Sequence, residues 1–149
     1  MKTLFIFLFV IPLMAPAQTT RNDDIFTGGN CTLSCMATVS NDSITCAYVS
    51  FDAKDDRLPT LKNYFTISYD APQNVYKFLT ELEKFSVDGS ATSGEISKHK
   101  VAIENVAGTK VVKVFDEHGL IFHRFSPKLI TGIKTKFLEW AAKNKIKLE

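Results

Sequence analysis

Three cysteines in one short stretch are the residues of this sequence best suited to chemistry. Cys31, Cys35 and Cys46 are the only cysteines of the chain, and the first two are separated by three residues. Thiols can form a disulfide bond, take part in redox reactions or hold a metal ion. The spacing and the local structure of this stretch therefore decide which chemistry is expected.

A disulfide bond is the first possibility, and an odd cysteine count predicts at most one bridge. If residues 31–35 are extended, a rise of ~3.3 Å per residue places Cys31 and Cys35 about 13 Å apart, beyond the ~7 Å that a disulfide spans. In a hairpin with Ala37 opposite Cys46, Cys35 is a diagonal neighbour of Cys46. We expect a Cys35–Cys46 disulfide, with Cys31–Cys46, Cys31–Cys35 and no bridge as alternatives.

A copper(I) site is the alternative use of the same segment. Cys31 and Cys35 supply thiolates and Met36 supplies a thioether, which are soft ligands, and His123 or His118 would complete the set from another strand. The spacing fits neither a C-x2-C redox pair nor a structural zinc site with paired ligands at both ends of a loop. We therefore expect no cofactor and keep a thiol-dependent copper or redox site as the alternative.

The two histidines late in the chain allow acid–base chemistry only where a carboxylate orients them. His118 follows Asp116 and Glu117 in a polar segment that is typical of a turn. His123 falls among apolar residues on one strand face, where a hydrogen-bonded core histidine is expected. A small hydrolase based on His118 or His123 is the second alternative, because the sequence contains no nucleophile elbow, phosphate loop or catalytic zinc motif.

A cationic and aromatic strand face is the favoured candidate for binding. In the predicted last hairpin, Lys113 and Arg124 fall on the same face as Phe115 and Phe122. Cationic side chains stack on aromatic rings, and arginine also binds carboxylates. We expect these four residues to contact an unknown protein or small-molecule partner. The alternative is that the two long side chains only cover apolar surface and keep their charges in water.

The composition limits the classes to which this protein can belong. The chain has 149 residues, is 45% hydrophobic and carries a formal net charge of +2. This charge lacks the clustered basic excess of nucleic-acid-binding proteins, so no nucleic acid partner is expected. Lys2, the apolar run Leu4–Met14 and the small residues before Gln18 predict a signal peptide over residues 1–17. After its removal we expect a periplasmic or secreted protein without a stable membrane span.

Periodicity predicts the elements that position these residues. Residues 18–30 are polar and contain Gly28-Gly29, so a flexible lead-in is expected there. The rest, residues 31–149, forms one domain, and the sequence has no evident internal repeat. Apolar residues recur at three and four positions after Pro72 and Pro127, which predicts two amphipathic helices.

The remaining segments alternate polar and apolar residues, which predicts strands. One hairpin turns at residues 40–43, and another pairs Phe115 with Leu120. The predicted order ββαβββα favours an α+β fold, an antiparallel sheet of about five strands with two helices on one face. This order resembles that of longin- and profilin-like domains, a likeness of element order that implies no function. The sequence thus predicts an exported, non-catalytic α+β binding module.

Overall fold

A computed structural model describes residues 18–148 apart from 41–42, 58–59, 61–62 and 89, and the predicted signal peptide lies outside the described residues. The order of elements is ββββαββββα. Their bounds are β1 Thr19–Gly28, β2 Cys31–Ser40, β3 Ser43–Lys54, β4 Tyr64–Asp70, α1 Pro72–Val87, β5 Ser93–Ile96, β6 His99–Val106, β7 Thr109–Phe115, β8 Phe122–Phe125 and α2 Pro127–Lys143. The predicted α+β class is confirmed.

The strands form two antiparallel sheets instead of the single sheet of about five strands that the sequence predicted. The first sheet has the order β1-β2-β3-β4 and the second has the order β5-β6-β7-β8. Each sheet is a meander followed by one helix, so the element order repeats although the sequence shows no repeat. The chain passes through α1 after β4, and among the described residues the next four strands pair with one another.

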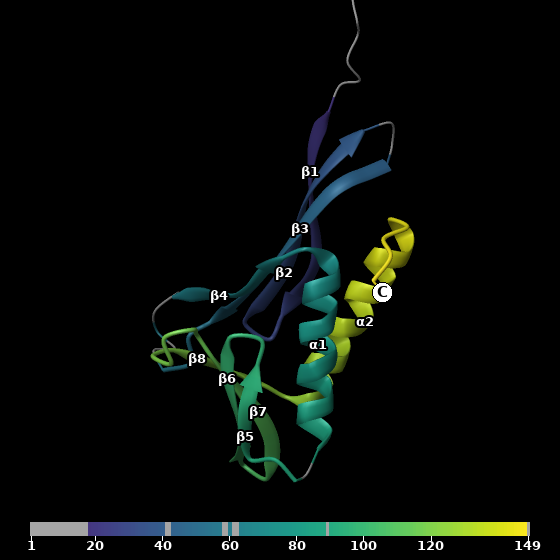
Figure 1. The fold of residues 1–149 in the computed structure, drawn as a ribbon. Coiled ribbons are helices and arrows are strands. Elements are labelled where there is room, and N and C mark those ends of the chain that lie inside the picture. The colour runs from purple at the N-terminus through teal and green to yellow at the C-terminus, as the bar shows by residue number, and fades with distance from the viewer. Residues whose placement is uncertain (1–17, 41–42, 58–59, 61–62, 89, 149) are drawn as a thin grey trace, which may run out of the picture.

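Both helices lie on the same side of the two sheets, as predicted (Figure 1). The ring of Phe51, from the first sheet, lies 6.3 Å from Phe78 of α1 and 5.6 Å from Phe125 of the second sheet. The same core contains Ile133 and Phe137 of α2. Each helix starts at a proline, which is suited to the first turn. One apolar core therefore joins both halves of the chain.

The predicted lead-in at residues 18–30 contains strand β1, which pairs with β2 along its whole length. A two-residue turn at Gly29-Asn30 connects them, with φ of +58° and +59°. Two positive φ values define the type I′ turn that suits a tight hairpin. The Gly-Asn pair was a readable hairpin signal. The strand itself was missed because most of its residues are polar and exposed.

The two predicted hairpins form with altered registers. Ser40 pairs with Ser43 as expected, but a bulge after Thr38 places Ala37 opposite Ala47 instead of Cys46. In the last hairpin, Phe115 pairs with Phe122 instead of Leu120. That slip of two residues keeps every side chain on its predicted face, because strand side chains alternate with a period of two.

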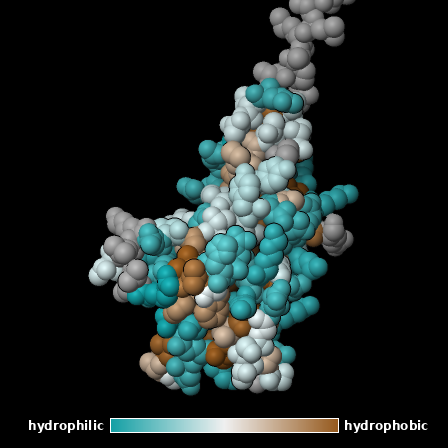
Figure 2. Space-filling view, turned by 60° about the vertical axis from the view of Figure 1, so that its left-hand side comes forward, coloured by the Kyte–Doolittle hydropathy of each residue, from teal (hydrophilic) through white to brown (hydrophobic). Residues whose placement is uncertain are grey.

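The upper ends of β1, β2 and β3 project beyond the ends of the helices (Figure 1). In Figure 2 the most hydrophobic residues gather mainly at the height of the second sheet, whereas the projecting part is mostly white to teal with a few light-brown residues. No helix within the described part of the chain is long and apolar enough to span a bilayer.

Candidate functional site

Cys31 and Cys35 lie on the side of β2 that faces the helices, and both are buried. The Cys31 thiol donates a hydrogen bond to the carbonyl oxygen of Gly28 at 3.0 Å. Burial raises the pKa of the Cys31 thiol to about 12 and that of the Cys35 thiol to about 11. Both groups are therefore protonated at neutral pH, whereas a nucleophile or metal ligand is the thiolate.

The structure corrects the predicted Cys35–Cys46 disulfide, because Cys35 is a free thiol. The bulge places the backbone of Cys46 opposite Thr38, three residues beyond Cys35. At ~3.3 Å per residue this is about 10 Å along the strand, too far for a bond. Cys31 is free as well.

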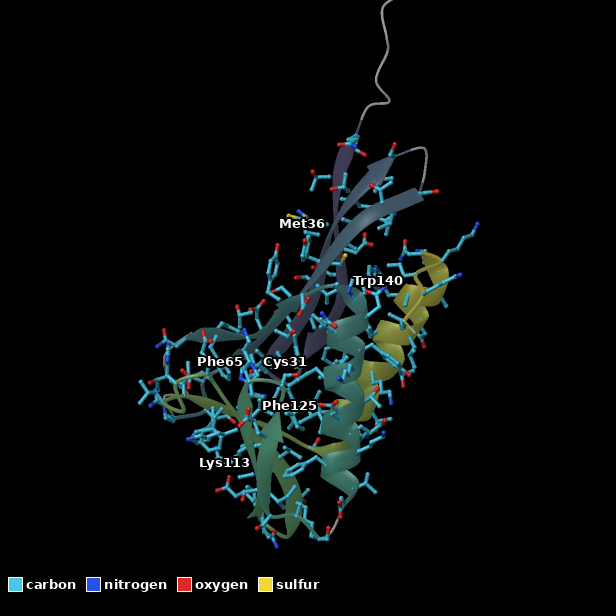
Figure 3. All side chains as sticks on the ribbon, viewed as in Figure 1. Cys31, Met36, Phe65, Lys113, Phe125 and Trp140 are labelled. Atoms are coloured by element: carbon cyan, nitrogen blue, oxygen red, sulfur yellow. The ribbon has the colours of Figure 1, made fainter. Side chains whose placement is uncertain are left out.

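The residues of the alternative copper(I) site are not brought together. Met36 points away from the helices, on the opposite side of the first sheet from Trp140 (Figure 3), and it is exposed whereas Cys35 is buried. The Nδ1 atom of His123 is instead bonded to the backbone of Lys54. Within the described ranges, no three side chains of the types His, Cys, Asp and Glu are grouped as metal ligands.

Alkylation tests this assignment of the thiols. At pH 8, a pKa of about 12 lowers the thiolate fraction roughly a thousandfold relative to a thiol at 9.0, and a pKa of about 11 lowers it roughly a hundredfold. We expect Cys31 and Cys35 to react with iodoacetamide that much more slowly in the native protein than in urea, as measured by peptide mass spectrometry. The urea sample is left unreduced. If Cys35 did not react in the unreduced urea sample, this result would indicate that Cys35 is in a disulfide bond.

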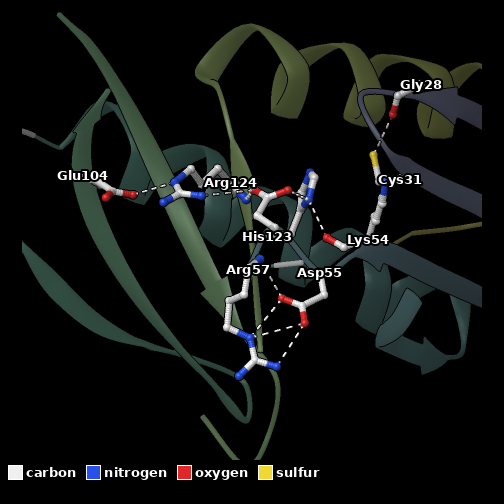
Figure 4. A network of polar contacts seen from close by, with 9 residues as sticks. Gly28, Cys31, Lys54, Asp55, Arg57, Glu104, His123 and Arg124 are labelled. Atoms are coloured by element: carbon white, nitrogen blue, oxygen red, sulfur yellow. Dashed lines mark hydrogen bonds and ion pairs between the residues drawn. The ribbon is translucent and has the colours of Figure 1, made fainter. Parts of the chain in front are cut away.

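His123 is a buried structural residue at the junction of the two sheets. Its Nδ1 atom lies 2.8 Å from the Lys54 carbonyl oxygen and 3.2 Å from an Asp56 carboxylate oxygen (Figure 4). Its ring packs edge-on against Phe125 with centroids 4.6 Å apart. Its Nε2 atom is buried and has no hydrogen-bond partner among the described residues. The predicted core role of His123 thus agrees with its place in the structure.

The Asp116–Glu117–His118 segment is a turn. The Asp116 carboxylate accepts hydrogen bonds from the backbone N–H groups of Leu120 and Ile121, at 2.7 and 2.9 Å. His118 is exposed on this turn. These contacts give Asp116 a structural role in closing the last hairpin.

Lys113, Arg124, Phe115 and Phe122 come together on the outer face of the second sheet, as the sequence predicted. Lys113 and Arg124 pair directly across β7 and β8. The Lys113 ammonium lies 4.0 Å from the centre of the Phe122 ring, and the Arg124 guanidinium lies 4.8 Å from it. The rings of Phe115 and Phe122 are 5.5 Å apart.

Two carboxylates that the sequence analysis missed neutralise these cations. Arg124 Nε donates to Glu104 at 2.7 Å (Figure 4), and the Lys113 ammonium lies 3.9 Å from the same carboxylate. The Arg124 guanidinium also lies 3.7 Å from Asp56. The hydrogen bond from Arg124 holds the pKa of Glu104 below its usual range. Glu104 lies on β6 and Asp56 follows β3, so neither could be assigned to this face without the pairing of the sheets.

The segment that follows β3 connects the first sheet to the second. Asp55 is fully buried and accepts hydrogen bonds from the Arg57 side chain through both carboxylate oxygens, at 3.2, 3.3 and 3.0 Å (Figure 4). The Asp56 backbone N–H donates to the Phe122 carbonyl oxygen at 2.9 Å. The hydrogen bonds from Arg57 lower the pKa of Asp55 below its usual 3.8.

This lowered pKa predicts a pH-dependent contribution to stability. A carboxylate with a lower pKa in the folded state stabilises the protein fully above its unfolded value and loses that contribution as pH falls through the folded value. We therefore expect the difference in free energy of unfolding between the wild type and Asp55→Asn to shrink once the pH drops below 3.8. Urea unfolding at pH 7 and pH 3 measures it. The exposed Asp24→Asn variant is the control, and an equal difference at both pH values would contradict the prediction.

The outer face of the first sheet holds a cluster of large exposed side chains, which we call the tyrosine cluster: Met36, Tyr48 and Tyr69. Met36 pairs with Tyr48 across β2 and β3. The rings of Tyr48 and Tyr69 stack with centroids 5.6 Å apart and planes at 13°. The exposed fractions are 47% for Met36, 44% for Tyr48 and 56% for Tyr69. Sequence analysis missed this cluster because the register that joins its three strands contains two bulges.

Small hydroxyl residues surround the tyrosine cluster. Ser34 lies opposite Ser50 on β2 and β3, and Thr32 lies opposite Asp52. The Asp52 carboxylate accepts hydrogen bonds from Ser50 and Thr66. Directly paired residues share a face of the sheet. This face is therefore polar and hydrogen-bonded around a central patch of methionine and tyrosine.

Comparisons with protein-family models, with curated proteins and with solved structures gave no match for this chain.

Proposed function

We propose that this chain is an exported, non-catalytic binding protein that docks a protein partner on the face of the first sheet away from the helices. The observation that carries the proposal is the tyrosine cluster. Three large side chains are exposed together on a sheet face whose opposite side is packed against the helices. Export rests on the signal-peptide pattern of residues 1–17.

The chemistry of the tyrosine cluster supports a protein partner. Tyrosine and methionine are enriched at the centres of protein interfaces, and a polar rim commonly surrounds such centres. Tyrosine offers a large contact area and loses little conformational entropy on binding. The stacked rings of Tyr48 and Tyr69 are already held in place before binding. A flat, preorganised patch of this kind suits a protein surface.

The roles of the reactive side chains support binding over catalysis. The thiols of Cys31 and Cys35 are buried and have raised pKa values. Asp116 closes a turn, and His123 Nδ1 is bonded to the main chain. Each of these groups has a structural role that accounts for its position.

The cluster of Lys113, Arg124, Phe115 and Phe122 is proposed as a second part of the binding surface. Its cations are paired with Glu104 and Asp56, so it offers aromatic surface more than free charge. We expect charge reversal at Lys113 and Arg124 to weaken binding of the same partner. Unchanged binding would remove this face from the proposal.

The decisive experiment compares tyrosines inside and outside the tyrosine cluster. Partners are recovered on the immobilised wild-type protein from an extract of exported proteins, and their dissociation constants are then measured. Removing central tyrosines of an interface costs about 2 kcal/mol, or about thirtyfold in affinity. We expect that loss for Tyr48→Thr/Tyr69→Thr, since threonine keeps the preference for strands.

Tyr64→Thr is the matched control. Tyr64 lies on β4, is 53% exposed and pairs with Lys54, outside the tyrosine cluster. We expect this variant to bind as the wild type does. Equal affinity of all the variants, or an equal loss in the control, would overturn the proposed docking surface.

A further inference from the structure

A small pocket lies at the junction of the two sheets and borders the tyrosine cluster, since Tyr69 is one of its lining residues. Its walls come from the end of β4, the first turns of α1 and the turn between β5 and β6. Its volume is about 150 Å³. The pocket therefore fits one small polar unit instead of an extended ligand.

His99 gives this pocket an unused hydrogen-bond acceptor. The residue is only 8% exposed, and its Nδ1 atom lies 2.6 Å from the Phe115 carbonyl oxygen. A carbonyl oxygen only accepts, so Nδ1 carries a proton and Nε2 of the neutral ring keeps its lone pair. Nε2 has no partner among the described residues. Among the described residues, the buried side-chain atoms without a partner are Thr80 Oγ1 and His123 Nε2, so His99 Nε2 is open to the pocket, where a ligand hydroxyl can donate to it.

Asp70 adds a second acceptor to the same pocket. Its Oδ1 atom accepts hydrogen bonds from the Ala71 N–H at 2.7 Å and from the Asn74 side chain at 2.9 Å. These bonds fix the carboxylate at the start of α1. The other oxygen, Oδ2, has no partner among the residues that the structure describes.

Lys98 supplies a donor and balances the charge. Its side chain is exposed, lines the pocket and forms no ion pair with any described residue. One ammonium and one carboxylate leave the lining formally neutral, which favours a neutral ligand over an ion. Ile67 and Phe78, each only 3% exposed, form a small apolar part of the wall beside the exposed Tyr69.

The geometry points to a binding site for a neutral, hydroxyl-rich ligand, one sugar unit, held between His99, Asp70 and Lys98. A hydroxyl group both donates and accepts hydrogen bonds, so adjacent hydroxyls match two fixed acceptors beside a donor. The C–H groups of a sugar ring match the apolar wall of Ile67 and Phe78. This site goes beyond the proposed protein docking, since its polar groups are those of His99, Asp70 and Lys98 and its ligand is of a different class, with Tyr69 at the border of the two surfaces.

Nuclear magnetic resonance titration of the purified protein tests the site. The probes are methyl glucoside, methyl galactoside and N-acetylglucosamine, with acetamide as the comparison. We expect saturable shifts of the His99 ring nitrogen and of the backbone amides of residues 70–74 and 97–99 with at least one sugar. The absence of saturable shifts with all three sugars, or equal shifts with acetamide, would overturn the assignment.

Two exposed lysines provide a matched pair of variants that leave the core intact. Lys98→Ala removes the proposed donor, whereas Lys100→Ala removes an exposed lysine just outside the pocket. Removal of a hydrogen bond to a charged group lowers the affinity at least about tenfold. We expect that loss for Lys98→Ala only. Equal affinity of the two variants would exclude the pocket. The single variant Tyr48→Thr tests the protein-docking proposal separately, because Tyr69 lines the pocket whereas Tyr48 does not.

Discussion

Replacing Phe125 by alanine is expected to lower the free energy of unfolding by about 3–5 kcal/mol, the usual cost of a fully buried phenylalanine. Phe125 is fully buried on β8, and its ring contacts Phe51 of the first sheet and His123. The cavity would open at the place where the two sheets share one core. Urea unfolding followed by circular dichroism measures the change.

Leu120→Ala is the control for this experiment. Leu120 lies on the turn before β8 and is 66% exposed. A substitution at such a position usually changes stability by less than about 0.5 kcal/mol. If Phe125→Ala were as mild as Leu120→Ala, the second sheet would not share a core with the first.

The second large effect is expected at Gly29 in the turn between β1 and β2. Gly29 has a φ of +58°, and a Cβ atom there would lie 2.7 and 2.9 Å from the two methyl carbons of Leu129. Left-handed backbone costs a non-glycine residue about 1–2 kcal/mol, and overpacking adds about 1–3 kcal/mol. We therefore expect Gly29→Ala to lower the free energy of unfolding by about 2–5 kcal/mol in the same assay.

Gly108→Ala separates the two contributions. Gly108 also has a positive φ, +81°, but a Cβ atom there would meet no heavy atom within 4 Å. This variant should carry only the backbone cost of about 1–2 kcal/mol. Equal losses at both glycines would show that α2 does not press on the first turn through Leu129.

The faces of the strands were predictable, while their pairing was not. His123 and Lys113 fall on the predicted faces even though their hairpin is shifted by two residues. A slip of two preserves the alternation, whereas a single-residue bulge, such as the one after Thr38, changes which residues face each other. That bulge is the physical reason why the Cys35–Cys46 pairing failed.

The division into two sheets depends on contacts that are distant in the sequence. Phe51 and Phe125 meet although 73 residues separate them along the chain. Short strands such as β5, which has four residues, carry too few residues to show a period. The helices were predictable because their apolar stripes are long and each starts at a proline.

Candidate site residues were predictable only within one hairpin. Lys113, Arg124, Phe115 and Phe122 belong to adjacent strands, and their proximity followed from local alternation. Glu104 reaches them from a third strand, and the partners of the tyrosine cluster depend on two bulges. The pairing of charges and the clustering of surface side chains depend on how the strands pair in the sheet. The alternation of polar and apolar residues in the sequence does not predict that pairing.

Strand β1 lies at the border of the first sheet and pairs with β2 on one side only among the described strands. An unpaired edge strand of this length can pair with the edge strand of an identical molecule, and such pairing can continue from one molecule to the next. Along β1 the chain places Arg21, Asp23 and Asp24, with Arg21 bound to Asp23 at 2.7 Å. Charges at such a border oppose stacking of further copies. The same charged residues made this segment resemble a loop in the sequence. They therefore oppose polymerisation of the protein through β1.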